Sequence, residues 1–168
     1  FAEDVERILA DTPEYKQVAL FSATMPPAIR KITTKYLHDP VEVTVKAKTA
    51  TAENISQRFI QVAGPRKLDA LTRVLEVEPF DGMIVFVRTK RGADRLVKRL
   101  DARGLRADAI HGNKSQGQRD RALSRFQSGR VDTLVATDLA ARGIDVDGVS
   151  HVINFDPPSD HHAYIHRV

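Results

Sequence analysis

From residue 56 onward, short apolar runs alternate with longer stretches of helical periodicity, and this alternation constrains the fold more than any other feature. Strands are expected at 56–63, 83–87, 105–110, 133–137 and 151–156, and helices at 66–77, 91–103, 115–128 and from 159 onward. Strands joined through helices pair in parallel by right-handed crossovers, and such a sheet is covered by helices on both faces. We therefore predict a three-layer α/β/α domain with a mostly parallel sheet.

Capping signals indicate where two of these helices end or begin. Ser115 followed by Gln118 is a capping-box pattern at the start of the helix expected at 115–128. Gly129 and Gly104 stand where helices commonly end in a left-handed residue.

The first part of the chain has a different pattern. Residues 4–9 are typical of the end of an amphipathic helix, 18–23 of a buried strand and 41–45 of a short strand, while a helix is expected from Pro26 and Pro27 to Leu37. The polar stretch 46–54, KAKTATAEN, has no apolar periodicity and is typical of a linker. We therefore predict one domain in residues 1–45 and a second in residues 55–168.

Composition and charge limit the class of protein. The formal net charge is +4, and it is uneven, because Lys and Arg number seven against eight Asp and Glu in residues 1–53 but nineteen against fourteen in residues 54–168. A cationic surface favours phosphate-rich partners, although a solvated face of Lys and Arg explains the charge equally well.

The sequence has no Cys, which excludes disulfides, Cys-based zinc sites and thiol catalysis. It shows neither an apolar run of about 18 residues nor a signal peptide, so we expect a cytoplasmic location and no membrane association.

The loops that follow the expected strands carry groups suited to phosphate binding. They contain Arg88-Thr89-Lys90, His111-Gly112-Asn113, Thr137-Asp138 with Arg142–Asp145, and Asp156. Ligands of open α/β sheets bind beyond the carboxyl ends of the strands. Arg side chains, Thr hydroxyls and Gly backbone N–H groups bind sugar-phosphate oxygens. We therefore predict a sugar-phosphate track at this edge, and we assign His111 no acid–base role.

Six short motifs occur in order along the chain: SAT at 22–24, IVFVRTK at 84–90, AIHG at 109–112, QxxR at 116–119, ATDLAARGID at 136–145 and YxHR at 164–167. In this order and at these separations they resemble the later motifs of the DEAD-box ATP-dependent RNA helicases. The resemblance implies a RecA-like fold. Residues 1–45 would then be the C-terminal portion of the first RecA-like domain, and residues 55–168 most of the second.

The resemblance also implies roles for individual residues. RNA-backbone contacts, independent of base identity, would come from Arg88, Thr89, Gly112, Gln116, Arg119, Thr137 and Asp138. Thr137 would donate its hydroxyl to a phosphate, and Asp138 would organise its loop. The nucleotide would be faced by Arg142, Gly143 and Asp145, and Asp145 would accept a hydrogen bond from the ribose. Coupling of the ATP site to strand separation would involve Ser22, Thr24, His166 and Arg167.

From local sequence alone, several of these residues have simpler explanations. Asp138 is equally well placed as a helix N-cap, Thr24 as a cap before Pro26, and Asp145 as a turn residue. Arg119 on an exposed helix would otherwise be a solvent-facing side chain. The family resemblance favours the functional interpretations over these alternatives.

Two motifs that the chemistry needs are absent from the sequence. There is no GxxxxGK[ST] loop and no DEAD tetrapeptide, so the phosphate cradle and the Mg²⁺ ligand must come from elsewhere. We therefore expect a fragment that is inactive alone. Its parent would use ATP and Mg²⁺ to separate short RNA duplexes or remodel RNA–protein complexes. Two alternatives stay open: a non-enzymatic RNA-binding or interaction module, and a DNA-directed superfamily 2 helicase.

Overall fold

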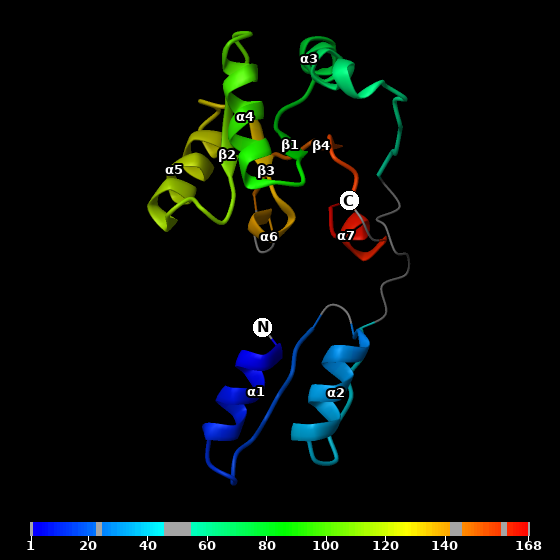
Figure 1. Cartoon of the computed structure of the whole chain (residues 1–168), viewed down its shortest axis with the longest axis vertical. Helices are drawn as coiled ribbons and strands as arrows, with labels where there is room; N and C mark the ends of the chain where they lie inside the picture. The colour runs from blue at the N-terminus through cyan, green and yellow to red at the C-terminus, as the bar shows by residue number, and fades with distance from the viewer. Residues whose placement is uncertain (1, 23–24, 46–54, 142–145, 159–160, 168) are drawn as a thin grey trace. The chain divides into compact units, whose positions relative to one another are not determined.

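The structure is a computed structural model that describes residues 2–22, 25–45, 55–141, 146–158 and 161–167. The chain divides into two compact units, Phe1–Ala47 and Lys48–Val168 (Figure 1). The linker expected at 46–54 lies outside the described residues. None of the helices in the described part of the chain combines the length and the apolar character that crossing a membrane requires.

The first unit is a pair of helices, α1 (Ala2–Asp11) and α2 (Pro27–Tyr36), close to the helices that the sequence predicts. Lys35 Nζ forms an ion pair with Glu6 Oε2 at 2.7 Å, and the Tyr36 hydroxyl donates to the Glu6 carbonyl oxygen at 3.2 Å. Among the described residues of this unit, Ile32 alone is buried. The helices therefore enclose very little apolar core of their own.

The two strands expected in the first unit are not formed. Residues 18–22 and 41–45 belong to no strand, and residue 23 lies outside the described residues. Val41, Val43 and Val45, which would form one face of the second strand, are 90%, 83% and 91% exposed. A strand needs a hydrogen-bonded neighbour and a surface to cover its apolar face. Neither is present among the described residues of this unit, so local pattern alone does not produce the strands.

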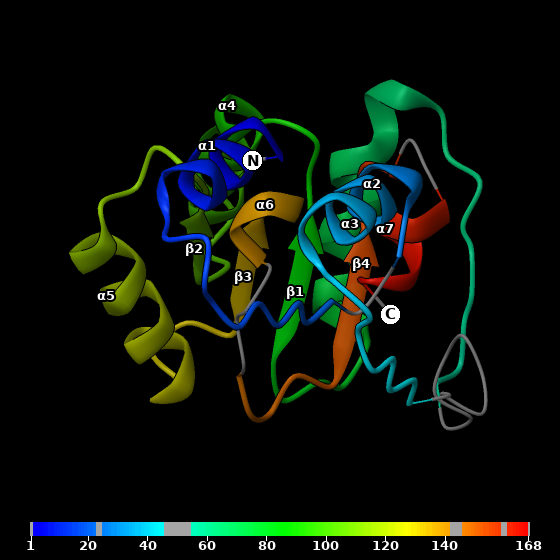
Figure 2. The ribbon, with the colours of Figure 1, turned by 90° about the horizontal axis from the view of Figure 1, so that it is seen from below.

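The second unit contains a four-stranded parallel sheet in the order β2-β3-β1-β4 (Figure 2). The strands are β1 (Met83–Phe86), β2 (Ala107–Ile110), β3 (Thr133–Ala136) and β4 (His151–Asn154). The helices are η1 (Gly64–Arg66), α3 (Lys67–Val77), α4 (Lys90–Asp101), α5 (Gln116–Gln127), α6 (Asp138–Ala141) and α7 (His161–Ile165). All four of these strands, and α3, α4, α5 and α7, lie within or close to the segments that the sequence predicts.

The prediction of a strand at 56–63 is also wrong, because this segment too has no neighbouring strand to pair with among the described residues. Residues 55–63 form no strand, and Phe59 and Ile60 are 91% and 66% exposed. The short helix α6 was not anticipated. It begins directly after β3, where the N–H groups of Ala140 and Ala141 both donate to the Thr137 carbonyl oxygen at 3.0 Å.

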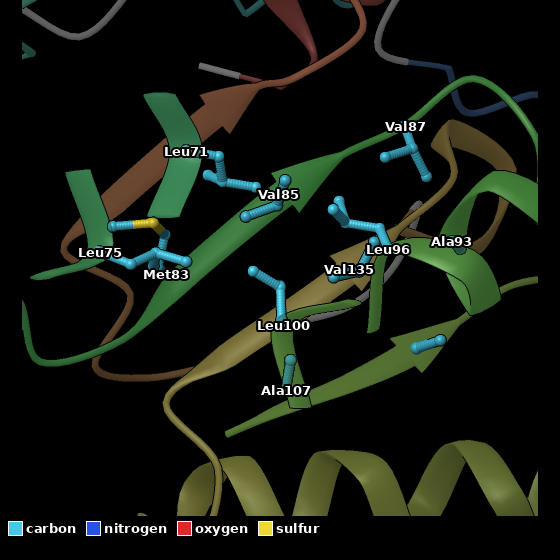
Figure 3. Packing of buried hydrophobic residues seen from close by; sticks show 11 residues of the cluster. Leu71, Leu75, Met83, Val85, Val87, Ala93, Leu96, Leu100, Ala107 and Val135 are labelled. Carbon is cyan, nitrogen blue, oxygen red and sulfur yellow. The ribbon is translucent and has the colours of Figure 1, made fainter. Parts of the chain in front are cut away.

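Two apolar clusters lie on opposite faces of the sheet. On one face, residues of α3 and α4, among them Leu71, Leu75, Leu96 and Leu100, pack against β1, β2 and β3 (Figure 3). On the other face, α5 and α6 pack against Ile110 and Leu134. Alternate strand residues point to opposite faces, which is why Met83 and Val85 belong to the first cluster and Ile84 to the second. The predicted three-layer α/β/α fold is confirmed.

The helix-end predictions in this unit are also confirmed. The Ser115 hydroxyl accepts a hydrogen bond from the Gln118 N–H, and the Gln118 amide oxygen accepts from the Ser115 N–H, which completes the capping box. Gly104 and Gly129 have φ angles of 76° and 69°, in the left-handed region that glycine adopts without a steric penalty.

Candidate nucleic-acid interface

The carboxyl ends of the four strands are aligned. Phe86 at the end of β1 pairs with Ala136 of β3 and Asn154 of β4, and Ile110 of β2 pairs with Ala136. The loops that follow the strands therefore leave the sheet at one edge. This alignment brings Thr89, Gly112 and Thr137 to the same end of the domain, as the sequence predicts.

The loop after β1 is shaped by Thr89, the N-cap of α4. The Thr89 hydroxyl oxygen accepts a hydrogen bond from the Gly92 N–H at 3.0 Å. Accepting leaves the hydroxyl hydrogen free to be donated to another group. Arg88 is exposed, and its backbone N–H donates to Asp156 Oδ2 at 3.1 Å. The loop is thus fixed from both sides while the Arg88 side chain faces solvent.

The loop after β2 is held against the start of α4. Lys90 Nζ donates to Asn113 Oδ1 at 2.8 Å. A Cβ added to Gly112 would come within 3.4 Å of Lys90 Cε, so the lysine lies directly beside the glycine backbone. Gly112 is nevertheless exposed, so it is accessible to a ligand.

His111 supports this loop from beneath. The side chain is 3% exposed, and Nδ1 accepts a hydrogen bond from the Asn113 N–H at 3.3 Å. An accepting Nδ1 places the proton of a neutral ring on Nε2. Nε2 lies 3.0 Å from Asp94 Oδ1, within ion-pair distance although not aligned for a hydrogen bond. These contacts are those of a buried turn residue.

Asp94 also contacts Lys114, whose Nζ lies 3.0 Å from the same carboxylate oxygen. Partial burial raises the pKa of the Asp94 carboxyl. The contacts with His111 and Lys114 together lower it by a larger amount, so the pKa lies below its ordinary value. The carboxylate therefore stays ionised and holds the loop after β2 to α4.

Gln116 and Arg119 lie in the first turn of α5, and their surroundings differ. The Gln116 amide donates to Asp120 Oδ1 at 2.8 Å, so part of its donor capacity is already used. Arg119 is half-buried, and its Nε is a buried donor without a hydrogen-bond partner among the described residues. An unsatisfied buried donor is uncommon and costly. This Nε is shielded from solvent, so an anion could reach Arg119 only through the remaining, partly exposed part of its guanidinium group.

Thr137 and Asp138, at the end of β3, are less accessible than the sequence suggests. Thr137 is 8% exposed. Both carboxylate oxygens of Asp138 accept hydrogen bonds from Arg167, at 2.5 Å from Nε and 2.7 Å from Nη2. The arrangement favours the expectation that Asp138 organises its loop.

Arg167 is itself buried, and its contacts are with other residues of the same domain. It is 5% exposed, its Nη1 donates to Asn154 Oδ1 and to the Asp156 carbonyl oxygen at 2.8 Å each, and its guanidinium carbon lies 4.7 Å from the centroid of the Phe86 ring. One side chain thus connects the loops after β3 and β4 with the end of β1.

Asp156 is a second connecting residue. Lys67 Nζ donates to Asp156 Oδ1 at 2.7 Å and also lies 4.5 Å from the centroid of the Phe155 ring. Burial raises the pKa of the Asp156 carboxyl, but the hydrogen bonds from Lys67 and from the Arg88 N–H lower it by more. Asp156 follows a strand and precedes Pro157-Pro158, which is a local signal. The contacts of Lys67 and Asn154 have no such signal, because Lys67 lies 89 residues from Asp156 and Asn154 lies 13 residues from Arg167.

The remaining predicted site residues are Ser22, Thr24, Arg142, Gly143, Asp145 and His166. Ser22 is exposed in the first unit, and His166 is exposed after α7. Thr24, Arg142, Gly143 and Asp145 lie outside the described residues. Among the residues that are described, no group of three or more His, Asp or Glu side chains could hold a metal ion.

Comparison with known proteins agrees with this architecture. Residues 66–168 match the family model for the helicase conserved C-terminal domain. The chain is 65% identical over 168 residues to ATP-dependent RNA helicase DeaD of Mycobacterium tuberculosis. The matched region covers all of this chain and 30% of the relative. It is 47% identical over the same length to DEAD-box ATP-dependent RNA helicase CshA of Bacillus cereus, covering 32% of that protein.

A solved structure of S. cerevisiae Dbp5, bound to RNA and ADP BeF3, matches with a TM-score of 0.82 and 31% identity, over 98% of this chain and 44% of that chain. The fold and the aligned loops are those of a RecA-like α/β domain. The chain belongs to the helicase C-terminal domain family, among the DEAD-box RNA helicases. The predicted family is therefore confirmed, and the chain spans about 30% of the length of the curated relatives it matches.

Proposed function

We propose that this chain is the part of a DEAD-box ATP-dependent RNA helicase that grips the RNA backbone and completes the nucleotide cleft. In the whole protein, ATP and RNA together would draw two RecA-like domains closed and release one strand of a short duplex. The observation that carries the proposal is the alignment of the four strand ends, because it gathers the predicted contacts at one edge.

The chemistry of that edge suits a sugar-phosphate backbone. Thr89 has a hydroxyl hydrogen to donate, Gly112 is exposed, and Arg119 is a half-buried cation in the first turn of α5. Such groups contact phosphate and ribose rather than base edges, so we expect binding without sequence specificity.

Arg167 and Asp138 would act as positioning residues. The predicted coupling role of Arg167 fits its contacts, since it ties the loop that holds Thr137 to the loop that holds Asp156. A shift of the last motif would therefore move the loops that carry the predicted RNA contacts. The coupling roles of Ser22, Thr24 and His166 are proposed on the family resemblance alone.

The nucleotide would be ATP with Mg²⁺. Transfer of its γ-phosphoryl group to water would return the protein to the open state. Arg142, Gly143 and Asp145 are proposed to face it. The described residues provide no metal site of their own, so we expect the metal ligands to come from the first RecA-like domain.

We propose that residues 1–45 are the end of that first domain and residues 46–54 the linker. Among the described residues of the first unit only Ile32 is buried, while Phe21 is 93% exposed and Val41, Val43 and Val45 at least 83% exposed. Apolar side chains of this kind are expected to be covered by a larger core. A cytoplasmic location is also part of the proposal.

RNA binding by the chain, measured by fluorescence anisotropy with a labelled single-stranded RNA, tests the proposal. Thr89→Asp is the informative variant, because Asp caps a helix as well as Thr does but places a negative charge at the edge. We expect it to weaken RNA binding while leaving the free energy of unfolding within about 0.5 kcal/mol. Arg119→Gln should also weaken binding, whereas Arg99→Gln, on exposed α4 surface, should not.

Two further measurements separate the alternatives. A single-stranded DNA of the same sequence should bind more weakly, because it lacks the 2′-hydroxyl groups. The chain alone should not release phosphate from ATP in the presence of RNA, whereas a longer form of the protein with the first domain should. Equal affinity of wild type and Thr89→Asp for RNA would contradict the proposed edge.

A further inference from the structure

A groove of about 560 Å³ runs beside the edge strand β2, between α4 and α5. β2 pairs only with β3 among the described strands, so its other side is open. The charged side chains that line the groove are Asp94, Lys98, Asp108, Lys114, Arg121 and Arg125. Four of these six side chains are therefore cationic.

The two carboxylates of the groove are already neutralised. Asp94 contacts Lys114 at 3.0 Å, and Arg125 Nη1 lies within 3.0 Å of both oxygens of Asp108. An anion entering the groove would therefore meet ion pairs rather than bare negative charge.

Lys98 and Arg121 are left without a counter-charge. Both are exposed, and neither forms an ion pair with a described residue, although Arg121 Nε donates to the Gly117 carbonyl oxygen at 3.1 Å. Lys98 comes from α4 and Arg121 from α5, so two uncompensated cations line one groove from its two walls. The arrangement favours a polyanion, whose binding would relieve this repulsion.

The groove reaches the loop after β2, because Asp94 and Lys114, which contact each other at that loop, both line it. It includes Lys114 and Gln118, which neighbour the predicted RNA contacts Gly112, Gln116 and Arg119 in the chain. A second hollow shares Asp108 and Arg125 with the groove and continues to Arg106 and Gly104, at the other end of β2. The two hollows together follow β2 from Ala107 to Ala109.

We infer that this groove binds the RNA segment that leaves the strand-end interface, so that the RNA path turns along the β2 edge past Lys98 and Arg121. The inference rests on the RNA-binding function proposed above. A four-residue strand is about 13 Å long, so the groove is long enough for only a few nucleotides. RNA fits better than a protein strand added to β2, because Lys98 and Arg121 present uncompensated positive charge on both walls of the groove.

Two sets of single-stranded RNA test the inference. One is just long enough for the strand-end interface, and the others are extended by a few nucleotides at the 5′ or the 3′ end. Wild type should bind one extended RNA more tightly than the short RNA. The double variant Lys98→Gln/Arg121→Gln should lose that advantage and bind the short RNA as wild type does.

The salt dependence gives a second readout. Removing two phosphate contacts should flatten the slope of log affinity against log salt by about 1.4 for the extended RNA, because each single-strand contact contributes about 0.7. The control, Arg99→Gln/Arg130→Gln, removes the same charge from exposed positions outside the groove. It should bind the short and the extended RNA with the same affinities as wild type.

Three results would overturn the inference. The extensions could add no affinity in wild type, or the double variant could weaken short and extended RNA equally. An acidic peptide of matched charge could also bind the groove more tightly than the extended RNA, which would identify a protein partner instead. Failure of wild type to bind even the short RNA would instead refute the proposed function itself.

Discussion

The guanidinium of Arg167 holds both carboxylate oxygens of Asp138, with Nε 2.5 Å from Oδ1 and Nη2 2.7 Å from Oδ2. Two parallel hydrogen bonds from one planar group fix orientation as well as distance. The two residues come from the ATDLAARGID and YxHR motifs, which are 29 positions apart at this pair. The motifs are thus joined within the domain, independently of any ligand.

Replacing Arg167 by Met should lower the free energy of unfolding by about 1.5–3 kcal/mol, as expected for hydrogen bonds to a charged group. Asp138 is 41% exposed at its side chain, so water can partly replace the lost partner and a larger effect is not expected. Urea denaturation measures the change. Arg167→Lys should not restore the stability, because an ammonium group cannot form the planar fork.

The matched control for this prediction is Arg99→Met, an exposed arginine on α4. Its unfolding free energy should stay within about 0.5 kcal/mol of wild type. Equal effects at Arg167 and Arg99 would show that the buried network contributes nothing specific.

Asp156 predicts a pH-dependent contribution to stability. Although burial raises the pKa of its carboxyl, Lys67 and the Arg88 N–H lower it to a net value below the ordinary 3.8. A depressed pKa in the folded state stabilises the fold above the ordinary value, and this contribution is lost as the pH falls through the folded pKa. Asp156→Asn should therefore be less stable than wild type at pH 7, and the difference should shrink below pH 3.8.

Unfolding by urea at neutral and at acidic pH measures that difference. Asp120→Asn is the comparison, because Asp120 is an exposed carboxylate on α5 that accepts a hydrogen bond only from Gln116 among the described residues. A gap between wild type and Asp156→Asn that is the same at both pH values would refute the role of the ionised carboxylate.

Ser115→Ala should destabilise the domain by about 1 kcal/mol, because it removes the side-chain acceptor of the α5 capping box. Ser124→Ala changes an exposed serine within the same helix and should be neutral or slightly stabilising, since Ala has the higher helix propensity. Thermal or urea unfolding of the two variants gives the comparison. If Ser115→Ala proved as stable as Ser124→Ala, the cap would not stabilise α5 in solution.

The pattern of the sequence predicts the second unit well because each of its elements finds a partner. Runs such as 83–87 and 133–137 pair with each other and are covered by α3 and α4. The runs 41–45 and 56–63 have equally good strand patterns, yet their apolar residues stay exposed. Periodicity reports which face would be buried, but a strand forms only where a neighbour completes it.

The candidate site shows the same division. Thr89, Gly112 and Arg119 could be placed at the edge from the order of strands and loops alone. The contacts of Arg167 with Asn154 and of Lys67 with Asp156 join residues whose neighbours in the sequence give no sign of them. Such long-range polar contacts depend on the tertiary fold, so local sequence reasoning could not find them.

Two glycines of the second unit are predicted to respond in opposite directions to the same substitution. A Cβ at Gly82 would lie 2.5 Å from Phe126 Cζ and 2.8 Å from the Gly148 carbonyl oxygen, and the second of these is backbone that cannot move aside easily. Gly82→Ala should therefore lower the free energy of unfolding by about 1–3 kcal/mol, as overpacking does. Gly117 lies in α5 with nothing within 4 Å of its Cβ position, so Gly117→Ala should raise it by about 0.4–1 kcal/mol. Urea midpoints of the two variants are measured beside wild type. A Gly82→Ala midpoint at or above that of wild type would contradict the close packing at Gly82, and a Gly117→Ala midpoint below it would contradict the open space at Gly117.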